Sequence, residues 1–208
     1  EVMVKVLQDF SAQQQKEALE KIQADVGAAT KELIDPQNAI VMGKPDAAIK
    51  LILFVDPNCP HCRVFESTLN KIEKDLPEKD KLCIMIRQWP ILGKNSKEVA
   101  AGLIAANTQD SKKFQTLSKK IIKSDKPWDA ENFLVVAKES GYDIDKIKAA
   151  LEGEDVQNQI KNTNDLATRL GLEATPTLIL ADKKGARLVQ VTDENSLKAL
   201  LLEAVKAA

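Results

Sequence analysis

A pair of cysteines directly after an apolar run constrains this chain more than any other feature of its sequence. The run over residues 48–55 consists mostly of β-branched and large apolar side chains, as expected for a strand buried on both faces. Asp56-Pro57-Asn58 ends the run, and Pro60 stands where the first turn of a helix would begin. Strand, turn and helix therefore follow one another, with Cys59 and Cys62 at the start of the helix.

The rest of the pattern predicts an α/β fold. Leu82–Ile86 is the next predicted strand, parallel to the first and joined to it through the helix. Thr177–Leu180 and Leu188–Val191 are predicted to form a hairpin around Asp182–Gly185, followed by a final helix. Between these parts, helical spacing covers Val99–Ala106, Phe114–Ile122, Phe133–Ala137, Ile144–Leu151 and Ile160–Leu170. The chain is thus predicted to be a layered α/β domain with helices inserted in its middle.

The N-terminal segment is predicted to be helical up to Asp35-Pro36. Its apolar residues fall in two blocks, Met3, Leu7 and Phe10, then Leu19, Ile22, Val26, Ala29 and Leu33, and the second block has the spacing of a coiled-coil seam. Packing onto the chain's own domain is one interpretation. We favour self-association, because this stripe has no obvious partner within the chain, and we expect a bend at the polar residues Gln13–Glu17. The predicted organisation is a self-association segment over 1–35, a linker over 36–47 and a domain over 48–208 with its helical insertion at about 94–170.

The cysteine spacing predicts thiol-disulfide exchange. The thiolate is the attacking species, and an ordinary cysteine with a pKa of ~8.5 is mostly protonated at neutral pH. Placing Cys59 at a helix start directs unpaired backbone N–H groups and the positive end of the helix dipole at its sulfur, which favours the thiolate. Cys62, one turn further on, can attack a mixed disulfide at Cys59 and release the substrate. Cys59 is therefore expected to attack and Cys62 to resolve.

His61 is the chain's single histidine and lies between the two cysteines, after Pro60. An imidazole near the sulfur would stabilise the thiolate further and make the pair a stronger oxidant. The alternative is an exposed helix residue with no special role. We include His61 and Pro60 with the two cysteines in the predicted catalytic motif.

A metal site is the competing interpretation of the cysteine pair, because C-x-x-C is also half of a zinc-binding pattern. The chain offers no second such pair, so we predict no metal site and no bound cofactor, although Cu(I) could bind two thiolates. The remaining thiol, Cys83, lies within an apolar run and is predicted to be a small buried hydrophobic residue.

Thr175-Pro176 precedes a predicted core strand, where a proline is unusual because it cannot donate to the strand ladder. A cis peptide bond would turn the Thr175 backbone outward as an edge for an extended substrate. A plain turn proline is the alternative, and the residues by themselves leave it open.

Charge and hydropathy exclude several kinds of partner. Thirty basic and 31 acidic residues give a net charge of −1, which argues against nucleic acid and anionic membrane surfaces. The apolar run Leu51–Val55 is far shorter than the ~20 residues that cross a bilayer. The opening residues do not resemble a secretory signal, so we expect that signal to be absent or already removed.

Taken together, these motifs resemble the DsbA-like branch of the thioredoxin superfamily, the bacterial periplasmic disulfide oxidoreductases. The matching features, in order, are the strand into Cys59-Pro60-His61-Cys62, the stretch Gln88–Gly93, the helical insertion and Thr175-Pro176. The resemblance covers about 49–208 and implies a thioredoxin-like fold. It also implies that Pro176 is a cis-proline beside Cys59 and that Thr175 contacts substrate.

The chain departs from the simplest members of this branch in two ways. Leu53 stands where they carry a buried acidic residue, six positions before the first cysteine. The N-terminal helix is similar to the extensions of oligomeric members of the ScsC and DsbA2 types. We therefore expect a periplasmic homodimer, with a trimer as the alternative, that oxidises or isomerises disulfides in unfolded or wrongly paired secreted proteins and exchanges electrons with a membrane redox partner. The alternative function is a chaperone-like holdase or a Cu(I)-binding module using the same cysteines.

Overall fold

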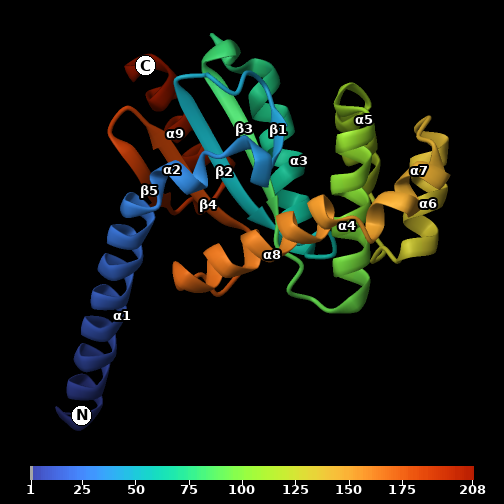
Figure 1. Cartoon of the computed structure of the whole chain (residues 1–208). Coiled ribbons are helices and arrows are strands. Elements are labelled where there is room, and N and C mark those ends of the chain that lie inside the picture. Colours follow the sequence, from blue (N-terminus) through green and yellow to red (C-terminus); the bar gives the residue numbers. More distant parts are fainter. Residues whose placement is uncertain (1) are drawn as a thin grey trace.

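The computed structural model describes the backbone of residues 2–208 and the side chains of residues 10–208 (Figure 1). The strands are β1 (Ile40–Met42), β2 (Ile49–Val55), β3 (Leu82–Gln88), β4 (Thr177–Asp182) and β5 (Gly185–Val189). The helices are α1 (Val2–Ala28), α2 (Thr30–Leu33), α3 (Pro60–Asp75), α4 (Lys94–Gln109), α5 (Ser111–Ile122), α6 (Ala130–Glu139), α7 (Ile144–Leu151), α8 (Glu154–Arg169) and α9 (Glu194–Ala207). Short 3-10 turns, Pro36–Asn38 and Lys79–Lys81, precede β1 and β3.

The strands form one sheet in the order β1-β3-β2-β4-β5. β2 and β3 are parallel, with Val55 opposite Gln88, and are joined through α3. β4 lies antiparallel to β2 and forms an antiparallel hairpin with β5. The predicted strand-helix-strand unit, the inserted helices and the closing hairpin and helix are therefore confirmed.

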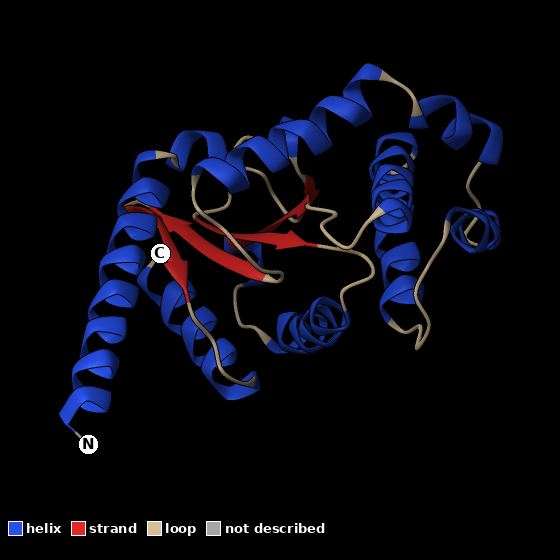
Figure 2. Ribbon diagram, turned by 90° about the horizontal axis from the view of Figure 1, so that it is seen from below, coloured by secondary structure: helices blue, strands red, loops and turns tan. Residues whose placement is uncertain are grey.

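Helices cover both faces of this sheet, as the edge-on view in Figure 2 shows. Leu51, Leu53 and Val55 of β2 belong to the core under α3, α4 and α9, whereas Ile52 and Phe54 belong to the core under α8 and the N-terminal helices. Side chains of a strand alternate between its two faces, so a strand covered on both sides must be apolar throughout. This explains why β2 has no polar alternation. No helix among the described residues is long and apolar enough to cross a membrane.

Strand β1 was not predicted. It lies within residues 36–47, which we expected to be a linker, and pairs antiparallel with β3 so that Ile40 faces Ile86. Ile40 is buried. A three-residue edge strand is too short to show a hydrophobic period, and only its pairing with β3 defines it.

The second apolar block of the N-terminal segment packs onto the chain's own domain, contrary to our preferred interpretation. Val26 and Leu33 are fully buried, and Ile22 and Ala29 pack against the same core. These residues pack against α8 and the face of the sheet that α8 covers, a partner that the sequence did not reveal. The predicted bend at residues 13–17 is also wrong, since α1 runs unbroken through them.

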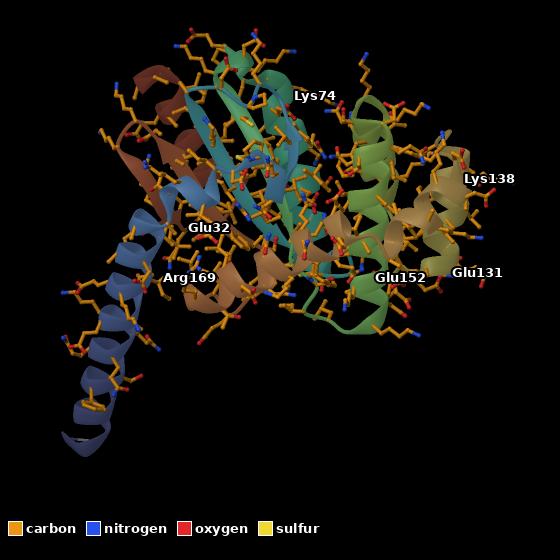
Figure 3. The ribbon with its side chains drawn as sticks, in the orientation of Figure 1. Glu32, Lys74, Glu131, Lys138, Glu152 and Arg169 are labelled. Carbon is orange, nitrogen blue, oxygen red and sulfur yellow. The ribbon has the colours of Figure 1, made fainter. Side chains whose placement is uncertain are left out.

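Polar bonds hold the N-terminal helices to the sheet. The buried Arg87 side chain of β3 donates from Nη2 to the carbonyl oxygens of Glu32 and Leu33, the latter at 3.1 Å. These carbonyls lie in the last turn of α2, where the Glu32 carbonyl also accepts from the Asp35 N–H at 3.3 Å, and the guanidinium adds a donor to each of them. Glu32 also pairs with Arg169 of α8, and Figure 3 shows the two side chains between these helices.

The N-terminal helices also cover the edge strand β5. Its outward N–H groups at Ala186 and Leu188 donate to Thr30 Oγ1 at 2.9 Å and to Gln23 Oε1 at 3.1 Å. Unpaired N–H groups on an edge strand invite association with other chains, and here side chains of α1 and α2 satisfy them. Beyond this anchored base, α1 extends away from the domain (Figure 1), and Phe10 and Leu19 are exposed. The side chains of Met3 and Leu7 lie outside the described residues.

Candidate active site

Cys59 is the N-cap residue of α3, directly after the turn that follows β2. Its backbone N–H donates to the carbonyl of Asp56 at 3.0 Å, and its own carbonyl accepts from the Arg63 N–H at 3.2 Å. Pro60 occupies the first turn, where a missing N–H costs nothing and the fixed φ suits a helix. The expected strand, turn and helix are thus in place, with both cysteines as free thiols at the positive end of the helix dipole.

The two cysteines differ in accessibility. Cys59 is 6% exposed and Cys62 is fully buried. Burial raises the pKa of the Cys62 thiol far above its ordinary value, and the neighbouring Cys59 raises it further against opposing hydrogen bonds from the Asp56 backbone and Thr175. A thiol in this environment keeps its proton at neutral pH. Cys59 is therefore the sulfur that a substrate can reach, and Cys62 needs help to ionise.

Thr175 and Pro176 lie against the cysteine pair although they are far away in sequence. The Cys59 thiol donates to the Thr175 carbonyl oxygen at 3.4 Å, and the Thr175-Pro176 peptide bond is cis. Both residues are half-buried. The structure thus places the cis Thr175-Pro176 segment against Cys59 and Cys62, the arrangement that the family resemblance implied and that the residues by themselves had left open.

Pro60 and His61 lie on the solvent side of α3, and both are exposed. They are the two residues between the cysteines. The motif therefore exposes a pyrrolidine ring and an imidazole ring directly after Cys59. Both side chains are therefore accessible to a bound chain.

Sequence reasoning missed Asp56, which it treated only as part of a strand-breaking turn. This carboxylate is fully buried and accepts from the Asn58 N–H at 2.7 Å, the Leu92 N–H at 2.9 Å and the Ser96 hydroxyl at 2.8 Å. A buried carboxylate is tolerated where several donors satisfy it. Asp56 thereby joins the turn before Cys59 to the loop after β3 and the start of α4. An Asp at the end of a buried strand is the only signal of this role in the sequence.

The helical insertion supports the other side of the turn. Asn58 donates from its side chain to the Trp128 carbonyl at 2.8 Å and accepts from the Trp128 N–H at 2.6 Å. Arg63 donates to the carbonyls of Ser124 and Lys126 at 2.9 and 2.8 Å. The loop between α5 and α6 is therefore hydrogen-bonded to both ends of the first turn of α3.

Exposed apolar side chains occur on α3 and in the loop after β3, which Asp56 joins to the cysteine turn. Val64 of α3 is 68% exposed, and Ile91 and Leu92 in the loop after β3 are 42% and 55% exposed. An open groove of about 380 Å³ runs beside Pro60 and Val64 towards Ile122. Exposed apolar groups beside a reactive thiol fit an unfolded polypeptide as the ligand.

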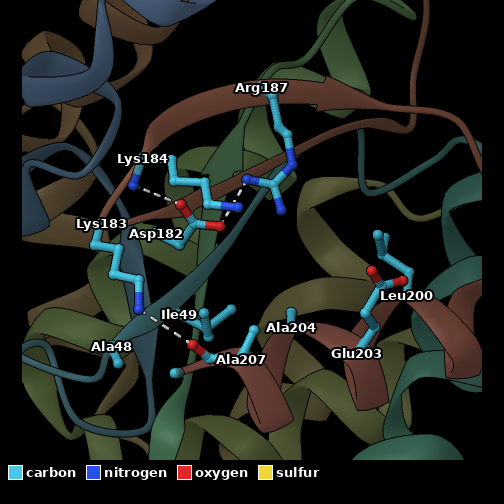
Figure 4. A pocket seen from close by; sticks show the side chains of 11 residues that line it. Ala48, Ile49, Asp182, Lys183, Lys184, Arg187, Leu200, Glu203, Ala204 and Ala207 are labelled. Atoms are coloured by element: carbon cyan, nitrogen blue, oxygen red, sulfur yellow. Dashed lines mark hydrogen bonds and ion pairs between the residues drawn. The ribbon is translucent and has the colours of Figure 1, made fainter.

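A second cavity of about 380 Å³ lies at the opposite end of the sheet, between the β4–β5 hairpin and α9 (Figure 4). Its lining includes Ile49, Asp182, Lys183, Arg187 and Glu203 but no cysteine. Arg187 pairs with Asp182 at 2.7 Å, and Lys183 donates to the Ala207 carbonyl at 3.3 Å. The cavity is remote from the cysteine pair, and we do not assign the chemistry to it.

The third thiol lies apart from the pair. Cys83 is fully buried on the α8 side of the sheet, which confirms its prediction as a small core residue. Within the described part of the chain, no three His, Cys, Asp or Glu side chains are grouped so as to hold a metal ion. The cysteine pair could offer a metal only two sulfur ligands.

Comparison with known proteins gives one family match and several relatives. The family model described as "Thioredoxin" matches residues 35–200. The probable disulfide bond formation protein D of Bacillus cereus is 28% identical over 145 residues, which are 66% of this chain and 67% of that protein.

Solved structures with similar folds include the following two. A thioredoxin-like oxidoreductase from Silicibacter pomeroyi superposes with a TM-score of 0.72 at 26% identity, covering 86% of this chain and 98% of that one. A Proteus mirabilis ScsC variant with a linker deletion superposes with a TM-score of 0.79 at 19% identity, covering 100% of this chain and 93% of that one. The second similarity extends over the N-terminal helix and concerns the fold alone.

Proposed function

This chain belongs to the thioredoxin family, and from that premise we propose that it catalyses thiol-disulfide exchange in secreted proteins, with Cys59 attacking and Cys62 resolving. The observation that carries the proposal is the position of Cys59 at the N-cap of α3, 3.4 Å from the Thr175 carbonyl. The fold is the expected thioredoxin-like one with inserted helices. The curated relatives are disulfide bond formation proteins, which supports a thiol-disulfide oxidoreductase of DsbA type.

The exchange proceeds through a mixed disulfide. In oxidation, a substrate thiolate attacks Cys59 of the Cys59–Cys62 disulfide, and Cys62 leaves with the electron pair and takes up a proton. The second substrate thiolate then attacks its partner sulfur, forming the substrate disulfide and releasing Cys59 as a thiolate. The helix dipole at Cys59 makes it a good leaving group in this second step, which favours oxidation of the substrate.

Isomerisation begins from the reduced protein. The Cys59 thiolate attacks a wrong substrate disulfide, forming a mixed disulfide and freeing one substrate thiolate, which attacks a second disulfide of the substrate. The substrate thiolate released there attacks the substrate sulfur bonded to Cys59, and Cys59 leaves as a thiolate. Cys62 acts only if the mixed disulfide persists, when it attacks Cys59 and releases the substrate. The same two sulfurs therefore serve both reactions, and the redox partner decides which one dominates.

Thr175 and the surface beside it are the proposed binding site for the substrate chain. The Thr175 backbone lies at the entrance to Cys59 and can pair with an extended segment that presents its cysteine to the sulfur. Val64 and Leu92 supply exposed apolar contacts on either side. We assign Pro60 to fixing the first turn of α3, Pro176 to shaping the Thr175 entrance, and His61 to stabilising the Cys59 thiolate.

We further propose that the exposed part of α1 mediates self-association, as a homodimer or a trimer. Only the first part of the segment remains available for this, because Val26 and Leu33 are used within the chain. Phe10 and Leu19 are exposed on the projecting helix. Several active sites in one assembly would raise the local concentration of thiols around a bound substrate and so favour isomerisation.

The proposed location is the periplasm, where disulfides form and persist, and the proposed redox partner is a membrane protein that renews the cysteine pair. The direct test of the function compares refolding of a scrambled-disulfide protein with oxidation of a dithiol peptide, using Cys59→Ser as the control. Activity in both assays supports a bifunctional oxidoreductase, and peptide oxidation alone supports an oxidase. If both assays fail, a holdase or Cu(I)-binding role for the same surface takes precedence.

A further inference from the structure

A carboxyl group lies one helical turn beyond Cys62 on the inner side of α3. The buried residues of this helix include Cys62, Leu69 and Ile72, and Glu66 falls within the stripe that they define. Side chains of a helix lean towards its N-terminus, so Glu66 leans back over the turn that holds Cys62. Glu66 is therefore the ionisable side chain of α3 best placed to exchange a proton with the Cys62 thiol.

Glu66 lines a small enclosed cavity between α3, the end of the sheet and α5. The cavity measures about 20 Å³, which is enough for one water molecule, and its polar lining consists of Glu66, Arg63, Gln88 and Ser118. Gln88 Oε1 is fully buried and has no hydrogen-bond partner among the described residues. A protonated carboxyl carries the O–H donor that this oxygen lacks, whereas a carboxylate does not.

The charged groups around the cavity leave the Glu66 carboxyl uncompensated. Arg63 is the other charged residue in the lining, and its Nη1 atom donates to the carbonyls of Ser124 and Lys126. The residues contributed by β2, β3, α4 and α5 carry no ionisable side chain. Burial raises the pKa of Glu66 to about 7, so the carboxyl is close to half ionised at neutral pH. A general base works best when its pKa lies near the working pH.

Neither of the other candidates near the cysteines is as well suited. Both carboxylate oxygens of Asp56 already accept hydrogen bonds, from the Asn58 and Leu92 N–H groups and from the Ser96 hydroxyl. His61 is exposed to solvent, whereas Cys62 is fully buried. Leu53, the apolar residue of β2 six positions before Cys59, is fully buried and cannot accept a proton.

We infer that Glu66 is the proton acceptor for the Cys62 thiol when Cys62 resolves the mixed disulfide, an assignment that rests on the proposed exchange reaction. The S–H bond of Cys62 breaks, and its proton passes to the Glu66 carboxylate, four residues further along the same face of α3. The Cys62 thiolate attacks Cys59 Sγ, the Cys59–Cys62 bond forms, and the bond to the substrate sulfur breaks. The substrate sulfur leaves with the electron pair as a thiolate. When a substrate thiolate opens the Cys59–Cys62 disulfide, protonated Glu66 returns the proton to Cys62.

The test uses the aromatic disulfide 5,5′-dithiobis(2-nitrobenzoate) and the reduced full-length protein in a stopped-flow experiment. Cys59 releases the first coloured thiolate at a rate proportional to reagent concentration. Attack of Cys62 on the mixed disulfide releases the second coloured thiolate, at a rate independent of reagent concentration. The Cys62→Ser variant identifies this second phase because it should abolish it. The second phase of the wild-type protein should rise with pH and level off above about pH 7, where the Glu66 carboxylate is formed.

Glu66→Gln should slow the second phase at pH 7 by on the order of 100-fold and remove its inflection near neutrality, while leaving the first phase unchanged. Glu66→Asp should restore a pH-dependent second phase, and Asp75→Asn, an exposed change on the same helix, should behave as wild type. An unchanged second phase in Glu66→Gln would overturn the assignment of Glu66 as proton acceptor and would leave the proposed redox pair standing. Failure of the wild-type protein to release a second thiolate would overturn the proposed redox pair and the Glu66 assignment together.

Discussion

The Cys59 thiol and the Thr175 carbonyl oxygen lie 3.4 Å apart although 116 positions separate them in the sequence. The contact joins the start of α3 to the loop that enters β4. These two elements meet because β4 pairs with β2, whose last residues lead directly into the cysteine turn. Sheet pairing therefore builds the entrance to the reactive sulfur, and the inserted helices close its other side through Asn58 and Arg63.

Replacing the resolving cysteine should trap the substrate. Cys62→Ser should accumulate a covalent complex through Cys59 when mixed with a scrambled-disulfide protein, because no second thiolate can attack the mixed disulfide. Non-reducing electrophoresis and intact mass analysis detect the complex. Cys59→Ser should give none, and Cys83→Ala should behave as wild type because Cys83 is buried away from the pair. A complex formed equally well by Cys59→Ser would refute the assigned order of attack.

Removing the Asp56 carboxylate should destabilise the fold. Asp56→Ala leaves the Leu92 N–H and the Ser96 hydroxyl without their acceptor, and we expect a loss of about 3 kcal/mol in the free energy of unfolding. Urea denaturation measures the loss. Asp75→Asn on the exposed surface serves as the matched control and should change stability by less than about 0.5 kcal/mol. Equal stabilities of the two variants would show that the Asp56 hydrogen bonds contribute little.

Two truncations should separate the two parts of the N-terminal segment. Deletion of residues 1–18 should leave stability nearly unchanged, because it removes none of the anchoring contacts of Gln23, Thr30 or Leu33. Deletion of residues 1–35 also removes buried Val26 and Leu33 and the acceptors of the Arg87 guanidinium. Loss of two buried side chains and of the carbonyl acceptors of the buried Arg87 guanidinium should cost at least about 5 kcal/mol.

The shorter truncation is consequently the proper test of self-association. Sedimentation of the 1–18 deletion should show a smaller species than the full chain if Phe10 and Leu19 form the contact between copies. The same deletion should reduce refolding of the scrambled substrate and preserve oxidation of the peptide. An unchanged sedimentation profile would exclude this part of α1 as the contact.

The stability of the protein should depend on pH through Glu66. Burial raises the pKa of Glu66 from about 4.5 to about 7, so the folded state holds a proton that the unfolded state releases. This contribution is fully present below about pH 4.5 and is lost as the pH rises to about 7, with an upper limit of about 3 kcal/mol. The difference in unfolding free energy between the wild type and Glu66→Gln isolates the contribution of Glu66, because the other ionisable groups contribute equally to both proteins. A difference that does not vary between pH 4.5 and 8 would contradict the raised pKa.

Local patterns were sufficient to predict the regular elements other than β1 and to single out the proposed redox pair. The apolar run 48–55 followed by Asp56-Pro57-Asn58 and Pro60 defines a strand, a turn and a helix through near-neighbour preferences alone, and the three-residue spacing of Cys59 and Cys62 places both at the helix start. The same holds for the hairpin at Asp182–Gly185 and for the inserted helices. These features depend on residues close together in the chain.

Tertiary structure decided what depends on distant residues. Strand β1 exists because Ile40–Met42 meets β3, and Val26 and Leu33 face their own domain because the outer face of the sheet and α8 offer an apolar surface. A heptad-like stripe is apolar whichever partner covers it, so its sequence cannot identify that partner. The hydrogen bonds of Asp56 and the cavity that joins Glu66 to Gln88 likewise arise where α3, α4, α5 and the sheet converge. The sequence by itself identified the two sulfurs that we propose to react, whereas packing alone decided what surrounds them, because burial and hydrogen bonding depend on residues brought together by the fold.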